Sequence, residues 1–182
     1  MSYETTENRA SERIAALLDE GSFVEIGAAV KARTTDFNMQ TKETPGDGVV
    51  TGYGVIDGNL VYVYSQNASV LQGAIGEMHA KKIAAIYDLA MKMGAPVIGL
   101  VDCAGLRLQE ATDALHAFGT LYMKQTLASG VIPQITAIFR NMWGRTCSDP
   151  FSDRLLRFME KEHAKFICEF SKCTGRKCYY KV

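Results

Sequence analysis

The 182-residue sequence lacks an excess of charge of either sign and lacks any long apolar run. Twenty lysine and arginine residues balance twenty aspartate and glutamate residues. No net field therefore attracts the chain to nucleic acid or to an anionic membrane surface. The first residues, MSYETTENRASERIAALL, mix both charges, and no apolar run approaches the ~20 residues that span a bilayer. The sequence predicts no nucleic-acid partner, no direct membrane insertion and, by default, a cytoplasmic location.

Cysteine is scarce in the first three quarters of the chain, where only Cys103 occurs. The other four lie in the last quarter, at Cys147, Cys168, Cys173 and Cys178. Structural zinc usually requires closely paired ligands, whereas the last three of these cysteines are each five residues apart. Nothing in the sequence indicates secretion, which argues against a disulfide framework. We therefore expect no metal site.

The order of apolar patterns indicates an α/β domain. Apolar residues make up 47% and charged residues 22% of the chain, as in an ordinary globular domain. Periodicity and turn residues predict a helix at 11–20, a strand at 21–26, a hairpin of 49–56 with 60–64, a helix between Gly76 and Gly94, a strand at 97–101, a helix at 111–128 and a strand at 135–139. The alternation of strands and helices in the second half is typical of a parallel sheet with right-handed crossovers.

The segment after the predicted strand 97–101 is the first place to look for a ligand site. Parallel α/β sheets bind ligands at the carboxyl ends of their strands, where backbone NH groups of the next turn point outward. Ala104 and Gly105 are small enough for a substrate to approach closely. The NH groups of Gly105 and Leu106 would be placed to bind a substrate oxygen on which negative charge develops. On fold rules alone, the alternative is a small-residue turn that simply caps a strand.

Three motifs follow one another between Thr44 and Glu110: TPGDGVVTGYG, YSQNASVLQGAIGEMHAKKI and GAPVIGLVDCAGLRLQEA. Over residues 10–139 they resemble the acyl-CoA carboxyltransferase subunits of biotin-dependent carboxylases and decarboxylases, of the propionyl-CoA carboxylase beta chain and methylmalonyl-CoA decarboxylase alpha chain type. The resemblance implies a crotonase/ClpP-like βαβαβ sheet, incomplete here. It implies transfer of a carboxyl group between carboxybiotin and the α-carbon of a short acyl-CoA. It also implies no tightly bound cofactor, biotin supplied on a partner carrier protein, and a homo-oligomer in the full-length family.

The resemblance assigns roles to individual residues. The DCAGLRLQE turn corresponds to the first of two oxyanion turns in the family, so the backbone NH groups of Gly105 and Leu106 are the expected catalytic donors. Relatives commonly read S-G-G-A-R-I-Q-E-G here, so Leu106 replaces alanine and Ala111 replaces glycine, which alters the acyl pocket rather than the backbone role. Contacts with acyl-CoA are expected from Gln66, Asn67, Gly73 and Ala104. For the first three, a polar loop that leads into a helix is an equally good interpretation.

Other polar residues of these motifs have simpler interpretations. Lys81 and Lys82 could meet CoA phosphates, but adjacent helical lysines usually form a solvated face. His79 and His116 have no adjacent serine or cysteine nucleophile, which argues against a catalytic triad. Glu110 lies close to the turn, but the family relies on backbone donors and biotin, so we expect a structural role for this carboxylate.

The resemblance stops after Phe139, where the second oxyanion turn of the family should follow, and returns in the original frame only over residues 158–165, FMEKEHAK. The chain reads RNMWGRTC there, with Trp143 where glycines are needed. If Arg140 is encoded by AGR, a one-nucleotide displacement of the frame can restore GICGGGLAVIPFLTDF, and a second displacement from Phe166 can restore LFVNSPNALEGN. We therefore divide the chain into 1–139, the N-terminal part of a carboxyltransferase domain, and 140–182, an aberrant tail in a shifted frame that should pack poorly. Coding DNA that cannot spell the C-G-G-G core in a displaced frame would contradict this hypothesis.

Three functions remain open from the sequence. The first is the carboxyltransferase subunit, in a chain that is truncated and expected to be inactive alone. The second is a non-catalytic remnant or subunit-interaction module. The third is a crotonase-type hydratase or isomerase, which would need a catalytic carboxylate aimed at the substrate. Binding of a short acyl-CoA separates the second from the others, and dependence on biotin separates the first from the third.

Overall fold

A single mixed sheet with helices on both faces forms the protein in the computed structural model, which describes residues 4–33, 44–139, 154–157 and 167–168. Its strands lie in sequence order: β1 (Val24–Glu25), β2 (Val49–Ile56), β3 (Asn59–Gln66), β4 (Val97–Val101), β5 (Gln134–Ile138), β6 (Arg154–Arg157) and β7 (Ile167–Cys168). Strands β1 to β3 are antiparallel neighbours, β3 to β6 run parallel, and β7 is antiparallel to β6.

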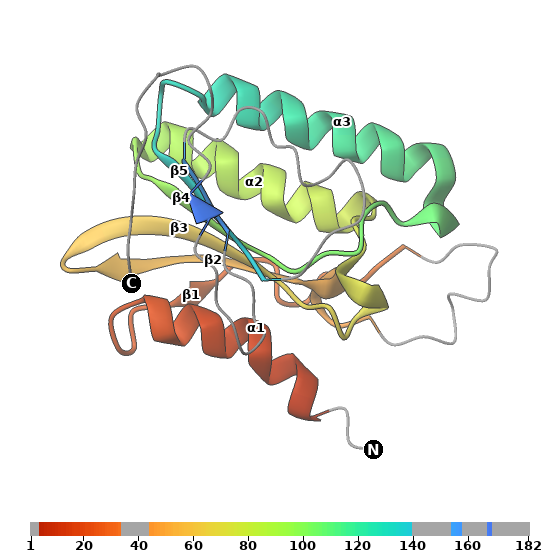
Figure 1. Ribbon diagram of the computed structural model, residues 1–182, viewed down its shortest axis with the longest axis horizontal. Helices are drawn as coiled ribbons and strands as arrows, with labels where there is room; N and C mark the ends of the chain where they lie inside the picture. The colour runs from red at the N-terminus through yellow and green to blue at the C-terminus, as the bar shows by residue number, and fades with distance from the viewer. Residues whose placement is uncertain (1–3, 34–43, 140–153, 158–166, 169–182) are drawn as a thin grey trace.

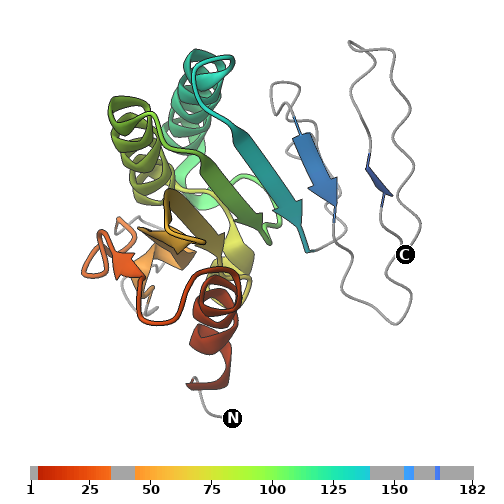
Figure 2. The ribbon, with the colours of Figure 1, turned by 90° about the vertical axis from the view of Figure 1, so that its left-hand side faces the viewer.

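The helices form two layers (Figures 1 and 2). Helix α1 (Glu4–Leu17) covers one face of the sheet, whereas α2 (Glu77–Met93) and α3 (Ala111–Ala128) lie side by side on the other. Helix α2 joins β3 to β4 and α3 joins β4 to β5, which are the two predicted βαβ units. Three short 3-10 turns, η2 (Gly46–Gly48), η3 (Leu71–Gly73) and η4 (Leu108–Glu110), lie beside the amino-terminal ends of α2 and α3.

The predicted hairpin is confirmed, with a loop of two residues. Ile56 pairs with Asn59, which leaves Asp57 and Gly58 as the loop. Their φ angles of 49° and 79° are the positive values that a type I′ turn requires, and this turn matches the twist of the flanking strands. Helix α2 ends as predicted at Gly94, whose left-handed conformation (φ 65°, ψ 23°) stops the helix.

Two predicted elements differ most from the structure. Helix α1 begins at Glu4 instead of residue 11. The strand predicted at 21–26 is reduced to β1, which pairs only with β2 among the described strands. As an edge strand β1 is not covered on both sides, and Val24 is accordingly 46% exposed.

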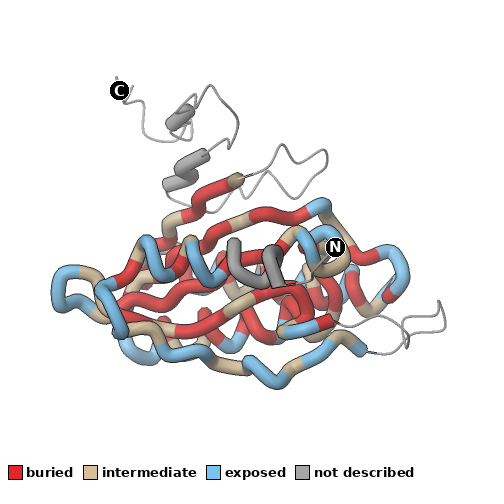
Figure 3. The backbone as a smooth tube through the Cα atoms, turned by 90° about the horizontal axis from the view of Figure 1, so that it is seen from below, coloured by how far each residue is buried: buried red, intermediate tan, exposed pale blue. Residues whose placement is uncertain are grey.

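The core consists mainly of two apolar clusters, one on each side of the sheet. Figure 3 shows buried residues along the strands of the sheet. Val97 of β4 packs in the layer under α2 and α3, whereas Ile98 and Leu100 pack in the layer under α1. This alternation confirms that β4 is buried on both faces, as its continuous apolar sequence predicts. The carboxyl end of β4 is therefore held in the middle of the molecule, and the turn that follows it has a rigid base.

Part of the predicted aberrant tail joins the sheet. Strand β6 pairs in parallel with β5, from Ile135 with Arg154 to Ile138 with Arg157. The edge of β5 offers unpaired backbone groups, and an extended segment such as β6 satisfies them. Trp143 does not belong to the described residues. Among those residues, no helix has the length and apolarity to cross a membrane.

Candidate functional site

The turn after β4 is attached to the segment after η3 by a short ladder. The amide of Ile75 donates to the carbonyl of Gly105 (2.9 Å), and the carbonyl of Ile75 accepts from the amide of Arg107 (2.9 Å). These two bonds make a parallel bridge between Ile75 and Leu106. In such a bridge the amide of the central residue points away from the partner strand. The Leu106 amide accordingly makes no hydrogen bond within the described part of the chain.

Gly105 follows the exposed Ala104 in this turn and has open space beside its Cα atom. Its φ of 117° strongly favours glycine, and a Cβ atom built there would meet no atom within 4 Å. Its amide donates to the sulfur of Cys103 at 3.1 Å. A thiol is a weak acceptor, so this contact is easily exchanged for a stronger one. The two amides expected to act as oxyanion donors thus lie next to each other, one unpaired within the described residues and one weakly bonded.

Gly73 and Ala104, both expected to contact acyl-CoA, differ in their exposure. Gly73 (φ 67°) is buried against it, and a Cβ atom there would overlap the carbonyl oxygen of Asp102. Ala104 is exposed, and its amide donates to the carbonyl of Gln72 at 3.0 Å. The structure therefore gives Gly73 a packing position behind the turn and leaves Ala104 on the open side.

Gln66 and Asn67 use their side chains inside the protein. Gln66 is 2% exposed; its Oε1 accepts from the amide of Asp102 (3.2 Å) and its Nε2 bonds His79 Nε2 (3.0 Å). The Oδ1 of Asn67 accepts from the amide (3.1 Å) and the hydroxyl (2.5 Å) of Ser69, as in an Asx turn. The expected direct contact of Gln66 with acyl-CoA does not fit this arrangement, because both ends of its amide group are occupied.

A buried arginine joins three segments beneath the turn. Arg107 is 1% exposed, and its Nη1 lies 2.6 Å from Asp47 Oδ1 and 2.8 Å from Glu110 Oε1. Its Nη2 donates to the carbonyl of Ala74 at 2.8 Å. Burial raises the pKa of Asp47, and the nearby Arg107 guanidinium opposes that increase. Sequence reasoning missed Asp47 and Arg107, although each belongs to one of the three motifs.

Glu110 has the structural role expected for it. One carboxylate oxygen bonds Arg107, and the other accepts from the amide of Glu77 at 2.6 Å. Glu77 is the first residue of α2, where an unpaired amide and the helix dipole both favour a carboxylate. Glu110 therefore attaches the start of α2 to the turn and has no free oxygen for proton transfer.

His79 is buried, uncharged and fixed in one tautomer. Its Nδ1 lies 2.8 Å from the carbonyl oxygen of Asp47, which can only accept, so Nδ1 carries the proton. Nε2 must then accept from the side-chain amide of Gln66, whose oxygen accepts from Asp102. Burial lowers the pKa of His79 to about 3, and the charges of Arg107 and Lys82 add to that decrease.

The lowered pKa of His79 should make the protein less stable in mild acid. The ring of His79 takes up a proton near pH 6.5 in the unfolded protein but only near pH 3 in the folded protein. The contribution of neutral His79 to the free energy of unfolding is therefore fully present above pH 6.5 and decreases as the pH falls from 6.5 to 3. The limiting slope is about 1.4 kcal/mol per pH unit. His79→Asn keeps a donor for Asp47 and cannot titrate, so its unfolding free energy should decline less between pH 7.5 and 5.

Urea unfolding of the wild type and of His79→Asn between pH 7.5 and 5 checks this prediction. The raised pKa of Asp47 works in the opposite direction, because it favours the folded state at low pH, but both proteins contain this residue. The free energy of unfolding is plotted against pH for each protein, and the difference between the two slopes therefore gives the contribution of His79 alone. Parallel curves would contradict the expected role of this histidine.

The two adjacent lysines of α2 have different environments. Lys81 is exposed and pairs with Glu77 at 2.7 Å, as expected for a solvated face. Lys82 is 6% exposed, and its Nζ donates to the carbonyls of Gly46 (3.0 Å) and Val49 (2.5 Å). Burial lowers its pKa. The solvated-face interpretation is wrong for Lys82, because its side chain reaches under η2 and fastens that turn to the helix.

A depression of about 250 Å³ lies between the first turns of α2 and α3. It is lined by Glu77, Ala80, Lys81, Asp113, His116, Ala117 and Thr120. Its two alanines pack in one cluster with Cys103, so the depression backs onto the turn without including the Gly105 or Leu106 amide. Over the described ranges, no group of three or more His, Cys, Asp or Glu side chains is placed to hold a metal ion.

Comparisons with known proteins agree on one protein family. A family model described as the carboxyl transferase domain matches residues 2–155. The alpha subunit of methylmalonyl-CoA decarboxylase from Veillonella parvula is 47% identical over 158 residues, which are 87% of this chain and 31% of that protein. The propionyl-CoA carboxylase beta chain from Roseobacter denitrificans is 53% identical over 129 residues, which are 71% of this chain and 25% of that protein.

A similar solved structure is that of transcarboxylase 12S with methylmalonyl-coenzyme A and methylmalonic acid bound. It superposes with a TM-score of 0.79 at 38% identity over 81% of this chain and 29% of that chain. The chain therefore spans a quarter to a third of the length of these relatives. The family match continues past the predicted domain boundary at residue 139, up to residue 155.

Proposed function

Because this chain belongs to the carboxyl transferase domain family, we propose that it provides the thioester-binding half-site of a biotin-dependent acyl-CoA carboxyltransferase subunit. The observation that supports this function most directly is the unpaired Leu106 amide beside the weakly bonded Gly105 amide at the end of β4. Relatives named for methylmalonyl-CoA and propionyl-CoA indicate a short acyl-CoA as the substrate.

In this proposal the chain acts by binding the thioester and stabilising charge on its oxygen. The amides of Gly105 and Leu106 donate to the carbonyl oxygen, and the donation strengthens as the α-carbon loses its proton or its carboxyl group and the oxygen becomes negative. An oxyanion donor of this kind contributes about 3–4 kcal/mol to the transition state. Ala104 lies on the open side of the turn, where a small side chain leaves room for the acyl group.

The remaining parts of the reaction belong to partners in this proposal. Biotin on a carrier protein supplies or accepts the carboxyl group, and none of the described residues is assigned to it. The full-length subunit is expected to form homo-oligomers, and the cytoplasmic location also stays a prediction. This chain is expected to be inactive alone. Residues 140–182, predicted to be a shifted frame, would otherwise supply the second oxyanion turn, and most of them lie outside the described residues.

The two alternative functions receive less support. A hydratase or isomerase needs a carboxylate aimed at the substrate. Of the carboxylates at this turn, Glu110 has both oxygens bonded and Asp102 pairs with Arg13. A non-catalytic module has no need of two adjacent amides left available on a glycine-containing turn. The non-catalytic module predicts no selective recognition of a thioester carbonyl, whereas a hydratase or isomerase would also bind the thioester and would differ by turnover that does not depend on biotin.

Two CoA derivatives that differ only in the carbonyl group test the proposal. We expect propionyl-CoA to bind this chain about three to ten times more tightly than S-propyl-CoA, the thioether without the oxygen, which is the factor that one net hydrogen bond contributes. Isothermal titration of each compound measures the ratio. Equal dissociation constants, or binding of neither compound, would contradict the proposed function.

A further inference from the structure

We infer that Gln66 and Arg13 are positioning residues that hold the start of the 102–106 turn from opposite sides, so that the Leu106 amide faces the substrate. This inference rests on the proposed function. Both residues act on Asp102, the residue that links β4 to the turn. Neither touches the thioester, and their effect on recognition passes through the orientation of the turn.

On the side of α2, Gln66 holds the main chain of the turn. Its Oε1 accepts from the Asp102 amide at 3.2 Å, and its Nε2 is fixed by His79. His79 is fixed in turn by Asp47, whose main-chain oxygen contacts the ring and whose carboxylate accepts from the His79 amide at 2.7 Å. Because every group in this series is buried, Gln66 cannot rotate without leaving polar atoms unpaired.

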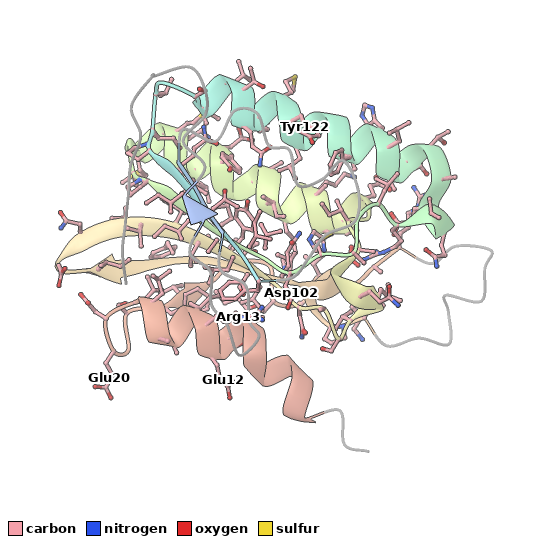
Figure 4. The ribbon with its side chains drawn as sticks, in the orientation of Figure 1. Glu12, Arg13, Glu20, Asp102 and Tyr122 are labelled. Carbon is pink, nitrogen blue, oxygen red and sulfur yellow. The ribbon has the colours of Figure 1, made fainter. Side chains whose placement is uncertain are left out.

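On the side of α1, Arg13 holds the side chain of the same residue (Figure 4). Its Nη2 lies 3.0 Å from Asp102 Oδ2, and the two side chains are only 12% and 13% exposed. The guanidinium also lies over the ring of Phe139, 4.1 Å from the ring centre. Phe139 follows β5, and its amide donates to the carbonyl of Val101 at 2.9 Å, so Arg13 is held against the neighbouring strand.

The Arg13–Asp102 pair differs from an ordinary ion pair on a protein surface. Surface pairs contribute little because both side chains are solvated and mobile. Arg13 is instead sheltered, stacked on an aromatic ring and aimed at the residue that Gln66 bonds from the other face. The far end of the turn is tied down by the bridge between Ile75 and Leu106. Loss of either contact at Asp102 would weaken the hold on the start of the turn, while the bridge keeps its far end in place.

The experiment compares two positioning variants with two controls. Gln66→Leu removes both hydrogen bonds of the amide, and Arg13→Met keeps the apolar stem of the arginine. Arg13→Lys restores a cation that can pair with Asp102. Lys124→Met removes a more exposed ion pair with Asp88 (2.5 Å) between α3 and α2, away from the turn. The dissociation constants of propionyl-CoA and S-propyl-CoA are measured for each protein, and circular dichroism verifies that each is folded.

The thioester preference is the dissociation constant of S-propyl-CoA divided by that of propionyl-CoA. We expect this ratio to fall to about one in Gln66→Leu and Arg13→Met, while the dissociation constant of S-propyl-CoA changes less than twofold. Arg13→Lys and Lys124→Met should keep the preference of the wild type. If Gln66→Leu does not fold, the Arg13 series alone decides. A preference that survives in Arg13→Met, or equal loss of both ligands, overturns the positioning role and leaves the proposed function intact. Absence of any preference in the wild type overturns the proposed function, and the positioning role with it.

Discussion

Replacement of Arg107 by methionine is expected to lower the free energy of unfolding by about 3–5 kcal/mol, the cost of removing one partner from a buried ion pair. The arginine is 1% exposed and neutralises two carboxylates, those of Asp47 and Glu110, whose side chains are fully buried. Without it, these carboxylates lie close together in an apolar setting and must either remain charged or take up protons. The protein should therefore be less stable at pH 7 and regain part of that stability at lower pH.

Urea unfolding at pH 7 measures this loss, and Arg33→Met is the matched control. Arg33 also pairs with two carboxylates, Glu77 and Asp113, but about half of its side chain is exposed. Its replacement should leave the unfolding midpoint almost unchanged, because solvent screens exposed pairs. Adding Asp47→Asn to the Arg107 variant should recover part of the lost stability, because one of the two unpaired charges disappears. Equal midpoints for the Arg107 and Arg33 variants would contradict the importance of the buried network.

Local signals were enough to predict most of the secondary structure. The hairpin follows from Asp57 and Gly58, the end of α2 from Gly94, and β4 from its continuous apolar sequence. Each of these depends on a few adjacent residues whose backbone preferences agree with the fold. The short, exposed β1 could not be predicted in the same way, because its surroundings depend on which strand lies beside it.

The candidate site was only partly predictable for the same reason. The position of the turn follows from the rule that ligands gather at the carboxyl ends of parallel strands, and Gly105 marks it in the sequence. The contacts beneath the turn join residues that are distant in sequence, such as Asp47 with Arg107 and Gln66 with Asp102. A single sequence carries no signal for such pairs. Lys82 shows the limit most clearly, since its sequence neighbours suggest solvent and its tertiary neighbours are backbone carbonyls.

Gly73→Ala should have a large effect on both stability and thioester recognition, and Gly94→Ala separates its two causes. The two glycines have nearly the same φ, 67° and 65°, so a side chain adds similar backbone strain at each, about 1–2 kcal/mol. At Gly94 a Cβ atom meets nothing within 4 Å. At Gly73 it overlaps the carbonyl oxygen of Asp102, and relief of that overlap requires η3 to move away from the turn.

We therefore expect Gly73→Ala to lower the unfolding free energy by about 1–3 kcal/mol more than Gly94→Ala, the usual cost of overpacking. Movement of η3 would also pull on the bridge between Ile75 and Leu106, which directs the Leu106 amide outward. The preference for propionyl-CoA over S-propyl-CoA should consequently be lost in Gly73→Ala and kept in Gly94→Ala. Urea unfolding and titration of the two CoA derivatives measure these effects. If both variants are equally stable and equally selective, close packing of Gly73 against the turn is not what orients the Leu106 amide.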